Sequence, residues 1–106
     1  ALDTAVRFDP RNARALVWLG MIQTNAGRGA DALTAFERAA QIDPTSVDAW
    51  IGIAHAHMNG GHLKAAAEAL HNAERLQPDR PVVKETAKRL QSMQAEMAPA
   101  RNRRDE

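Results

Sequence analysis

The chain has 106 residues, with 14 lysines and arginines, 13 aspartates and glutamates, and no cysteine. The length predicts one domain, and the balanced charge gives no electrostatic reason to expect a nucleic-acid or membrane partner. The missing cysteines exclude disulfides and thiolate-bound metals. No apolar run approaches the length of a membrane span and the start has no signal-peptide pattern, so we expect a cytoplasmic protein, although an already removed signal segment is compatible with this sequence.

A step of 34 residues relates much of the chain to itself. Prolines recur at this step as Pro10, Pro44 and Pro78. Other identities at the same step are Ala5 with Ala39 and Ala73, Ala15 with Ala49, Asn25 with Asn59, Gly27 with Gly61, and Ala32 with Ala66. A repeat of this length predicts one supersecondary unit that buries its apolar face by stacking on its neighbours.

Residues 1–12 match the second half of such a unit. Leu2 stands where later units have Phe36 and Leu70. We therefore predict the second helix of a preceding partial repeat, so that the chain begins in mid-repeat and is a piece of a longer array. Such an end exposes apolar side chains, and we expect homo-oligomers that form through residues 1–12 or exchange that segment between chains.

Residues 13–46 predict a first pair of helices. The apolar run 15–22 alone fits a buried strand or a helix, and the repeat decides for a helix that ends at Ala26. A glycine-rich turn follows, and residues 30–42 then place their apolar side chains on one face of a second helix. Pro44, which cannot donate a hydrogen bond within a helix, ends this second helix.

Residues 47–80 predict a second pair of the same kind. Thr45 or Ser46 is a suitable N-cap for its first helix, and Gly60-Gly61 ends that helix. An apolar stripe from Leu63 to Leu76 marks its second helix.

Residues 81–98 predict a last helix that caps the open end of the stack. Asp79 is the expected N-cap, and Pro81 is tolerated near the start of the helix. The expected buried side consists of Val83, Ala87, Leu90 and Met97. Residues 99–106 are too polar to pack, and we predict a disordered, solvated tail.

The recurring residues form a motif of fixed spacing. The first unit reads Leu16-x2-Leu19-Gly20-x2-Gln23, then Ala32-x3-Phe36, Ala39 and Pro44. The second unit reads Trp50-x2-Ile53-Ala54-x2-His57, then Ala66-x3-Leu70, Ala73 and Pro78. This motif resembles that of the tetratricopeptide repeat family, W-x2-L-G-x2-Y…A-x3-F…P. The resemblance implies an all-α solenoid of antiparallel helix pairs with a C-terminal capping helix.

The sequence contains no pattern typical of an active site or a metal site. His55 and His57 are two residues apart and point to different faces of a helix, so they do not converge on a metal. We expect His57 to be a hydrogen-bonded packing residue beside Gln23. No Ser/His/acid grouping and no phosphate-binding glycine loop is present. We therefore predict no catalytic, metal or cofactor-binding residues, no cofactor, and no enzyme activity.

The resemblance also implies a concave groove along the first helices of the units. The side chains expected to line it are Val17, Met21, Thr24, Asn25, Ile51, His55, Met58 and Asn59. One subclass of the family grips acidic chaperone tails with lysines, asparagines and an arginine. The positions that match this clamp hold Val17, Met21, Gly52, Val82 and Thr86, so a cationic grip is missing.

An apolar groove that carries methionines favours a helical or extended apolar segment as its ligand. We therefore predict a non-catalytic protein–protein interaction module, a scaffold or adaptor that binds a protein or peptide. Two alternatives stay open: a structural module for self-association, and a regulatory repeat segment attached to an upstream enzyme domain. The groove could also be covered by missing repeats or by the chain's own terminus.

Overall fold

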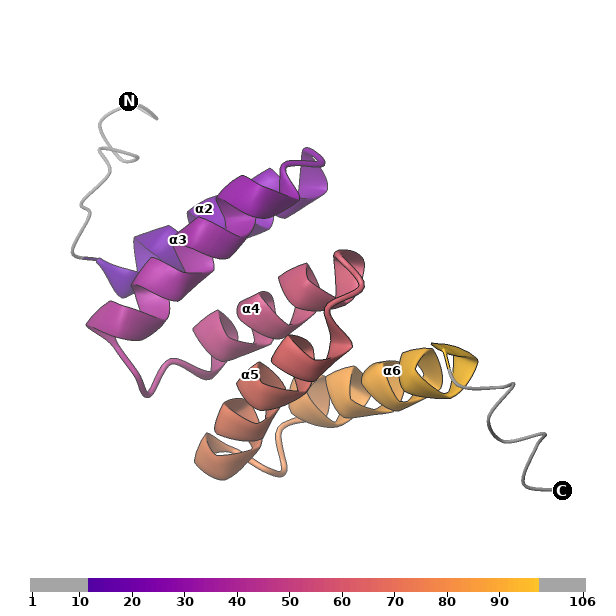
Figure 1. The fold of residues 1–106 in the computed structure, drawn as a ribbon. Coiled ribbons are helices and arrows are strands. Elements are labelled where there is room, and N and C mark those ends of the chain that lie inside the picture. The colour runs from indigo at the N-terminus through magenta and orange to yellow at the C-terminus, as the bar shows by residue number, and fades with distance from the viewer. Residues whose placement is uncertain (1–11, 98–106) are drawn as a thin grey trace, which may run out of the picture.

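The computed structural model describes residues 12–97, which form five helices joined by short turns (Figure 1). The helices are α2 (Ala13–Asn25), α3 (Gly29–Ile42), α4 (Val47–Asn59), α5 (Leu63–Leu76) and α6 (Pro81–Met97). The predicted all-α class is confirmed for this part of the chain. The predicted half-repeat at residues 1–12, its self-association and the predicted tail at 99–106 fall almost entirely outside the described residues.

The first helices of the two pairs begin with the same kind of cap. The Asn12 Oδ1 atom accepts a hydrogen bond from the Ala15 amide at 3.2 Å, and the Ser46 Oγ atom accepts one from the Ala49 amide at 3.3 Å. Asn12 and Ser46 are one 34-residue step apart, and each satisfies an amide that has no partner within its helix. Of the two predicted caps for α4, the structure therefore uses Ser46.

The start of α6 corrects a prediction. The helix begins at Pro81, and the Arg80 carbonyl accepts the Lys84 amide at 3.2 Å. Arg80 therefore takes the N-cap position, and Asp79 lies one residue too early to cap the helix. A proline at the first helical position explains the difference, because its fixed φ and missing N–H suit that position.

Glycines end the first helix of each pair. Gly27 and Gly61 have φ angles of 79° and 80°, which few residues other than glycine adopt without strain. After α2, the Arg28 amide donates to the Gln23 carbonyl at 2.8 Å and the Gly27 amide donates to the Thr24 carbonyl at 3.1 Å. This is a Schellman motif, and it turns the chain back so that the next helix packs on the one just completed.

One aromatic ring joins the two pairs. A methyl carbon placed on Gly20 of α2 would come within 2.6 Å of the Phe36 ring, and one placed on Gly52 of α4 would overlap the same ring. Phe36 on α3 is 3% exposed. The two glycines therefore let one side chain pack against the helix before it and the helix after it.

Fully buried alanines mark the other close approaches between helices. They are Ala32, Ala39, Ala49, Ala54, Ala66 and Ala73. All of them except Ala49 stand at positions of the repeat motif, as does Gly20, which packs against Phe36. Side chains of this size allow two helix backbones to come close without a void between them.

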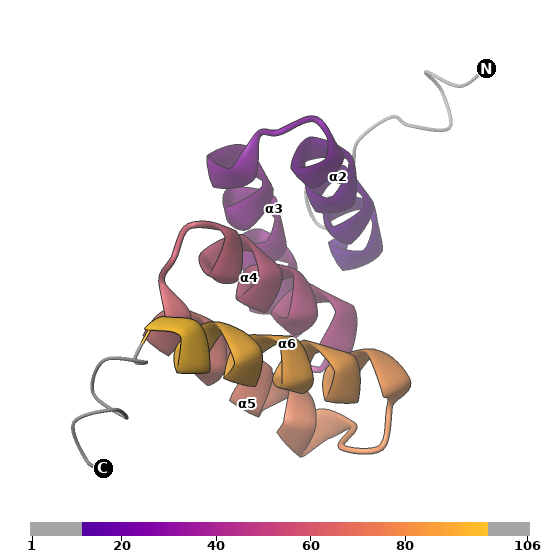
Figure 2. The same ribbon diagram turned by 90° about the vertical axis from the view of Figure 1, so that its right-hand side faces the viewer.

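The helices form a stack rather than a closed bundle (Figures 1 and 2). Helix α2 packs on α3 and α4 packs on α5, while α3 packs on α4 and α5 packs on α6. The first helices of successive units, α2, α4 and α6, also contact one another in that order and make one continuous face. None of the helices described is long and apolar enough to cross a membrane.

Candidate functional site

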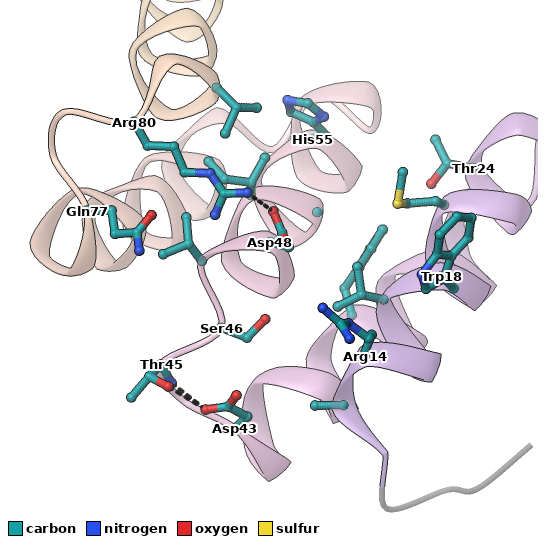
Figure 3. Close-up of a pocket in the computed structure, with 18 of the residues that line it drawn as sticks. Arg14, Trp18, Thr24, Asp43, Thr45, Ser46, Asp48, His55, Gln77 and Arg80 are labelled. Carbon is teal, nitrogen blue, oxygen red and sulfur yellow. Dashed lines mark hydrogen bonds and ion pairs between the residues drawn. The ribbon is translucent and has the colours of Figure 1, made fainter.

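A groove of about 750 Å³ runs between α2 and α4 (Figure 3). Its walls are residues from Ala13 to Asn25 on α2 and from Val47 to His55 on α4. The connection from Asp43 to Ser46 borders one end, and Val82 at the start of α6 borders the far side. The groove exists because α2 and α4 touch less extensively than the helices within each pair do, so their facing surfaces stay partly open.

The structure places six of the eight predicted groove residues in this lining. They are Val17, Met21, Thr24, Asn25, Ile51 and His55. Val17 and Ile51, one repeat step apart, are nearly buried, while Met21 is 50% exposed. The groove therefore has an apolar floor and a flexible, polarizable thioether at its edge.

The other two predicted groove residues, Met58 and Asn59, do not line the groove. Met58 is 3% exposed and belongs to the hydrophobic core together with Leu90 of α6. Met58 therefore lies in the core rather than in the groove, on the helix α4 against which α6 packs. Asn59 is exposed at the end of α4.

Sequence reasoning missed the charged end of the groove. Arg14, Asp43, Asp48 and Arg80 all contribute to the lining, and Arg80 Nη2 lies 3.0 Å from Asp48 Oδ1. The sequence did contain a signal for this charged end, because the 34-residue step places Arg14 and Asp48 at equivalent positions of α2 and α4. The two positive charges and the two negative charges balance, so the groove has no excess charge to select an acidic or basic ligand.

Trp18 is a second missed feature of the groove. Its side chain is 61% exposed on α2 and lines the groove beside Met21. Gly52, one repeat step after Trp18, has no side chain. The difference between this glycine and a large aromatic at the same position of the repeat was the available signal for Trp18. An exposed indole next to a thioether offers a ligand a large apolar contact.

His55, a residue of the groove lining, forms a hydrogen bond with α6. Its Nε2 atom lies 3.1 Å from Thr86 Oγ1, and the Thr86 hydroxyl donates to the Val82 carbonyl at 2.7 Å. The Thr86 hydroxyl proton is already used in the bond to Val82. The Nε2–H group of His55 is therefore the donor, and the Thr86 oxygen accepts. Burial, and then the positive charge of Arg89, lower the pKa of His55 below its ordinary value of 6.5. The imidazole is therefore held neutral near pH 7.

The positions that match the chaperone-tail clamp carry no cation in the structure either. Val17, Met21, Gly52 and Val82 line the groove. Thr86 is 2% exposed and uses its hydroxyl for the contacts with His55 and Val82. An acidic tail would therefore find no array of cationic side chains at these positions.

Among the described residues, no hydrogen bond joins His57 to Gln23. The Gln23 Oε1 atom is buried without a hydrogen-bond partner among the described residues. The His57 ring instead stacks on His62, with the ring centroids 6.0 Å apart. Within residues 12–97, no three histidine, aspartate or glutamate side chains converge in a way that could hold a metal ion.

Comparison with known proteins gives one family match. The family described as Tetratricopeptide repeat matches residues 24–90. The peroxisomal targeting signal receptor of Komagataella phaffii is 33% identical over 70 residues, which are 66% of this chain and 12% of the receptor. The human PEX5-related protein is 30% identical over 71 residues, which are 67% of this chain and 11% of that protein. The matched part of the chain thus covers only 11–12% of the length of these relatives.

Solved structures with the same arrangement of helices also exist. The Arabidopsis OM64 TPR domain has a TM-score of 0.75 at 23% identity, over 83% of this chain and 73% of that domain. YrrB, a TPR protein with an unusual peptide-binding site, has a TM-score of 0.73 at 26% identity, over 82% of this chain and 45% of YrrB. The Yersinia enterocolitica secretion chaperone SycD, in complex with a peptide of the translocator YopD, has a TM-score of 0.69 at 22% identity, over 88% of this chain and 71% of SycD.

Proposed function

Because the chain belongs to the tetratricopeptide repeat family, we propose that it is a non-catalytic protein-binding module whose groove takes an apolar segment of a partner. The observation that carries this proposal is the groove itself, with an apolar floor at Val17 and Ile51 and the exposed Trp18 and Met21 at its edge. The partner segment is helical or extended, since both forms present apolar side chains along one edge.

Two relatives support a peptide as the ligand. One is a receptor for a peroxisomal targeting signal, and YrrB has a peptide-binding site. The charge balance of Arg14 and Arg80 against Asp43 and Asp48 supports an apolar rather than an acidic segment. The predicted cytoplasmic location, and the predicted lack of nucleic-acid and membrane partners, stay predictions.

A random peptide library displayed on phage, panned against the whole chain, tests the proposal. We expect the selected peptides to be rich in apolar residues. Met21→Glu should weaken their binding roughly ten- to a hundredfold, because a buried methionine contributes roughly 1.5–3 kcal/mol. Moderate salt should change the affinity little, since screening acts on charges and not on apolar burial.

Ile42→Glu is the matched control for this experiment. Ile42 is an apolar side chain that is 43% exposed, compared with 50% for Met21, and it lies outside the groove lining. Binding to Ile42→Glu should equal binding to the parent chain. Equal losses in the two variants, selection of acidic peptides, or a strong decrease with salt would contradict the groove as the site.

The two alternative functions stay open beside this proposal. A structural role in self-association predicts a molecular mass above that of one chain in light scattering. A regulatory role beside an enzyme domain predicts such a domain upstream in the full reading frame. Either result is compatible with a groove that also binds peptides.

A further inference from the structure

One end of the groove presents a histidine side chain to a ligand. His55 is half-buried on α4, and Thr24 stands on the other wall of the groove, on α2 (Figure 3). Arg14 and Asp43 lie at the opposite end of the groove. The hydrogen-bonding groups at the His55 end can therefore be considered apart from the charges at the other end.

The contact with α6 fixes the ring of His55 in one tautomer. Its Nε2–H group donates to the Thr86 oxygen, because the Thr86 hydroxyl proton is used in the bond to the Val82 carbonyl. In a neutral imidazole the other nitrogen then carries no proton. Burial, and then the charge of Arg89, lower the pKa of His55, which keeps the ring neutral near pH 7. The Nδ1 atom of His55 is therefore a hydrogen-bond acceptor.

This acceptor is open to a ligand. Within residues 12–97, no hydrogen bond reaches His55 Nδ1, since the contact of the ring with Thr86 uses Nε2. Solvent can reach Nδ1, because Gln23 Oε1 is the one buried side-chain atom without a partner in this part of the chain. The open space beside His55 is the groove that it lines. A ligand in the groove can therefore donate a hydrogen bond to Nδ1.

Thr24 on the facing wall has the same polarity. Its hydroxyl donates to the Gly20 carbonyl at 2.8 Å, so its proton is used within α2. The Thr24 oxygen keeps lone pairs that can accept a hydrogen bond from a ligand. Both side chains thus offer acceptors here. This polarity is the reverse of that of the chaperone-tail clamp, whose lysines, asparagines and arginine donate to an acidic ligand.

The surroundings of His55 favour an uncharged donor from a peptide backbone. Arg89 disfavours a positive charge at His55, so an ammonium or guanidinium group fits this place poorly. An apolar ligand has few side-chain donors, which leaves its backbone N–H groups. These groups are used internally in a helix but are free in an extended segment. The carbonyls of such a segment can accept from the amide of Asn25, which also lines the groove.

We propose that His55 Nδ1 accepts a hydrogen bond from a backbone N–H of the groove ligand, and that His55 thereby selects an extended apolar segment over a helical one. This inference rests on the proposed function, because it needs a peptide in the groove. It makes His55 a specificity-determining residue. Thr86, which is 2% exposed, is a positioning residue that acts through the tautomer of His55.

The tautomer can be measured without a ligand. Nitrogen-15 NMR distinguishes a ring nitrogen that carries a proton from one that has a lone pair, and His55→Gln identifies the signals of His55. At pH 7 we expect the proton on Nε2 and the lone pair on Nδ1. Thr86→Val removes the acceptor for Nε2–H and should give a mixture of both tautomers. A proton on Nδ1 in the parent chain would overturn the inference, whether or not the groove binds peptides.

Peptides with single backbone changes test the contact itself. The probe is the tightest peptide from the phage selection that loses affinity with Met21→Glu. It is synthesised with one amide at a time replaced by an ester, which has no N–H. We expect one ester to weaken binding to the parent chain roughly two- to tenfold, as the loss of one hydrogen bond does.

Two substitutions of His55 separate its two nitrogens. The amide nitrogen of His55→Gln can replace Nε2 and donate to Thr86, but no acceptor remains at the position of Nδ1. The sensitive ester should therefore cause no further loss in this variant. The amide oxygen of His55→Asn can replace Nδ1 as the acceptor, so the ester should again weaken binding. Affinities are measured by isothermal titration calorimetry.

His71→Gln is the matched control, since His71 is exposed on α5 and lies outside the groove lining. Its response to each ester should equal that of the parent chain. An ester effect that persists in His55→Gln, or no ester effect in a peptide that Met21→Glu weakens, overturns the hydrogen bond to His55 and leaves the proposed function intact. If no selected peptide loses affinity with Met21→Glu, the proposed function fails and this inference fails with it.

Discussion

At the scale of the residue, the size of a side chain at one position decides how the two helix pairs join. Phe36 belongs to the first pair but packs against Gly52 of the second pair as well as against Gly20 of its own. A ring held between two glycines has no room to move away from a new methyl group. Interiors packed to this density respond even to a single added carbon.

Gly52→Ala should therefore destabilise the chain. The new methyl group would overlap the Phe36 ring, and such overpacking costs roughly 1–3 kcal/mol. Denaturant unfolding followed by circular dichroism measures the change in the free energy of unfolding. Alanine is favoured over glycine in a helix by up to about 1 kcal/mol. The variant loses stability only if the overpacking cost exceeds this gain.

Gly29→Ala is the control for that comparison. Gly29 is also helical, but a methyl carbon placed there meets no atom within 4 Å. We expect no loss of stability, and a gain of at most about 1 kcal/mol. If both alanine variants are equally stable, Phe36 does not depend on the missing side chain of Gly52.

At the scale of the element, α4 and α6 meet at a histidine whose charged form is disfavoured in the folded chain. His55 donates from Nε2 to the Thr86 hydroxyl, and burial together with the charge of Arg89 lowers the pKa of His55. The charged imidazolium is therefore less favourable in the folded chain than in the unfolded one. The unfolded state binds this proton more readily, so the contribution of His55 to stability is complete above pH 6.5 and is lost as the pH falls below that value.

We expect His55→Gln to flatten the dependence of stability on pH. The free energy of unfolding of the parent chain should fall as the pH decreases through 6.5, and the variant should lose less over the same range. Thermal unfolding at a series of pH values measures the slope. His71→Gln, an exposed position on α5, should keep the slope of the parent. A parent slope in the His55 variant would show that His55 is not the group responsible.

Local sequence signals predicted most of the element boundaries. Gly27, Gly61 and Pro44 act through their own backbone geometry, so their effect can be read without knowing what lies nearby in the fold. The repeat step then settled the choice between strand and helix for residues 15–22. The same step implied that groove residues of one unit would be groove residues of the next.

That last implication failed where the neighbours of the two units differ. Met58 is one step after Thr24, yet Met58 is in the core and Thr24 lines the groove. The difference arises from α6, whose position on α4 is a property of the packed molecule and not of either sequence segment. The exposed Trp18 was missed because its equivalent in the second unit, Gly52, has no side chain that could have indicated it.

At the scale of the whole molecule, the helices form a linear stack in which each contacts only its near neighbours. Stability in such a stack is a sum of terms within units and between adjacent units. The contacts α2·α4, α3·α4 and α4·α6 all involve α4, so the two ends of the stack are connected through this one helix. We infer that the described residues unfold as one cooperative unit.

Leu90→Ala tests this cooperativity from the far end. Leu90 is buried on α6, and its truncation should cost about 2–5 kcal/mol. With Trp50→Phe in the background, the Trp18 signal from α2 should shift to lower denaturant together with the helical signal of the whole chain. Gln91→Ala, at an exposed position of the same helix, should shift neither signal. Separate transitions for the two probes would show that α2 unfolds independently of α6.

The pairing of Phe36 with Gly52 also determines how an array of this kind could lengthen during evolution. If residues 13–46 were duplicated in tandem, Trp18 of the second copy would face Phe36 of the first copy. Only glycine leaves room for the Phe36 ring at that position. A duplication of residues 47–80 would set Leu70 against a second Gly52 and leave a void. Neither unit can therefore be copied in tandem without a compensating substitution at the new junction. The order of the repeats is encoded in the residues that face each other between units.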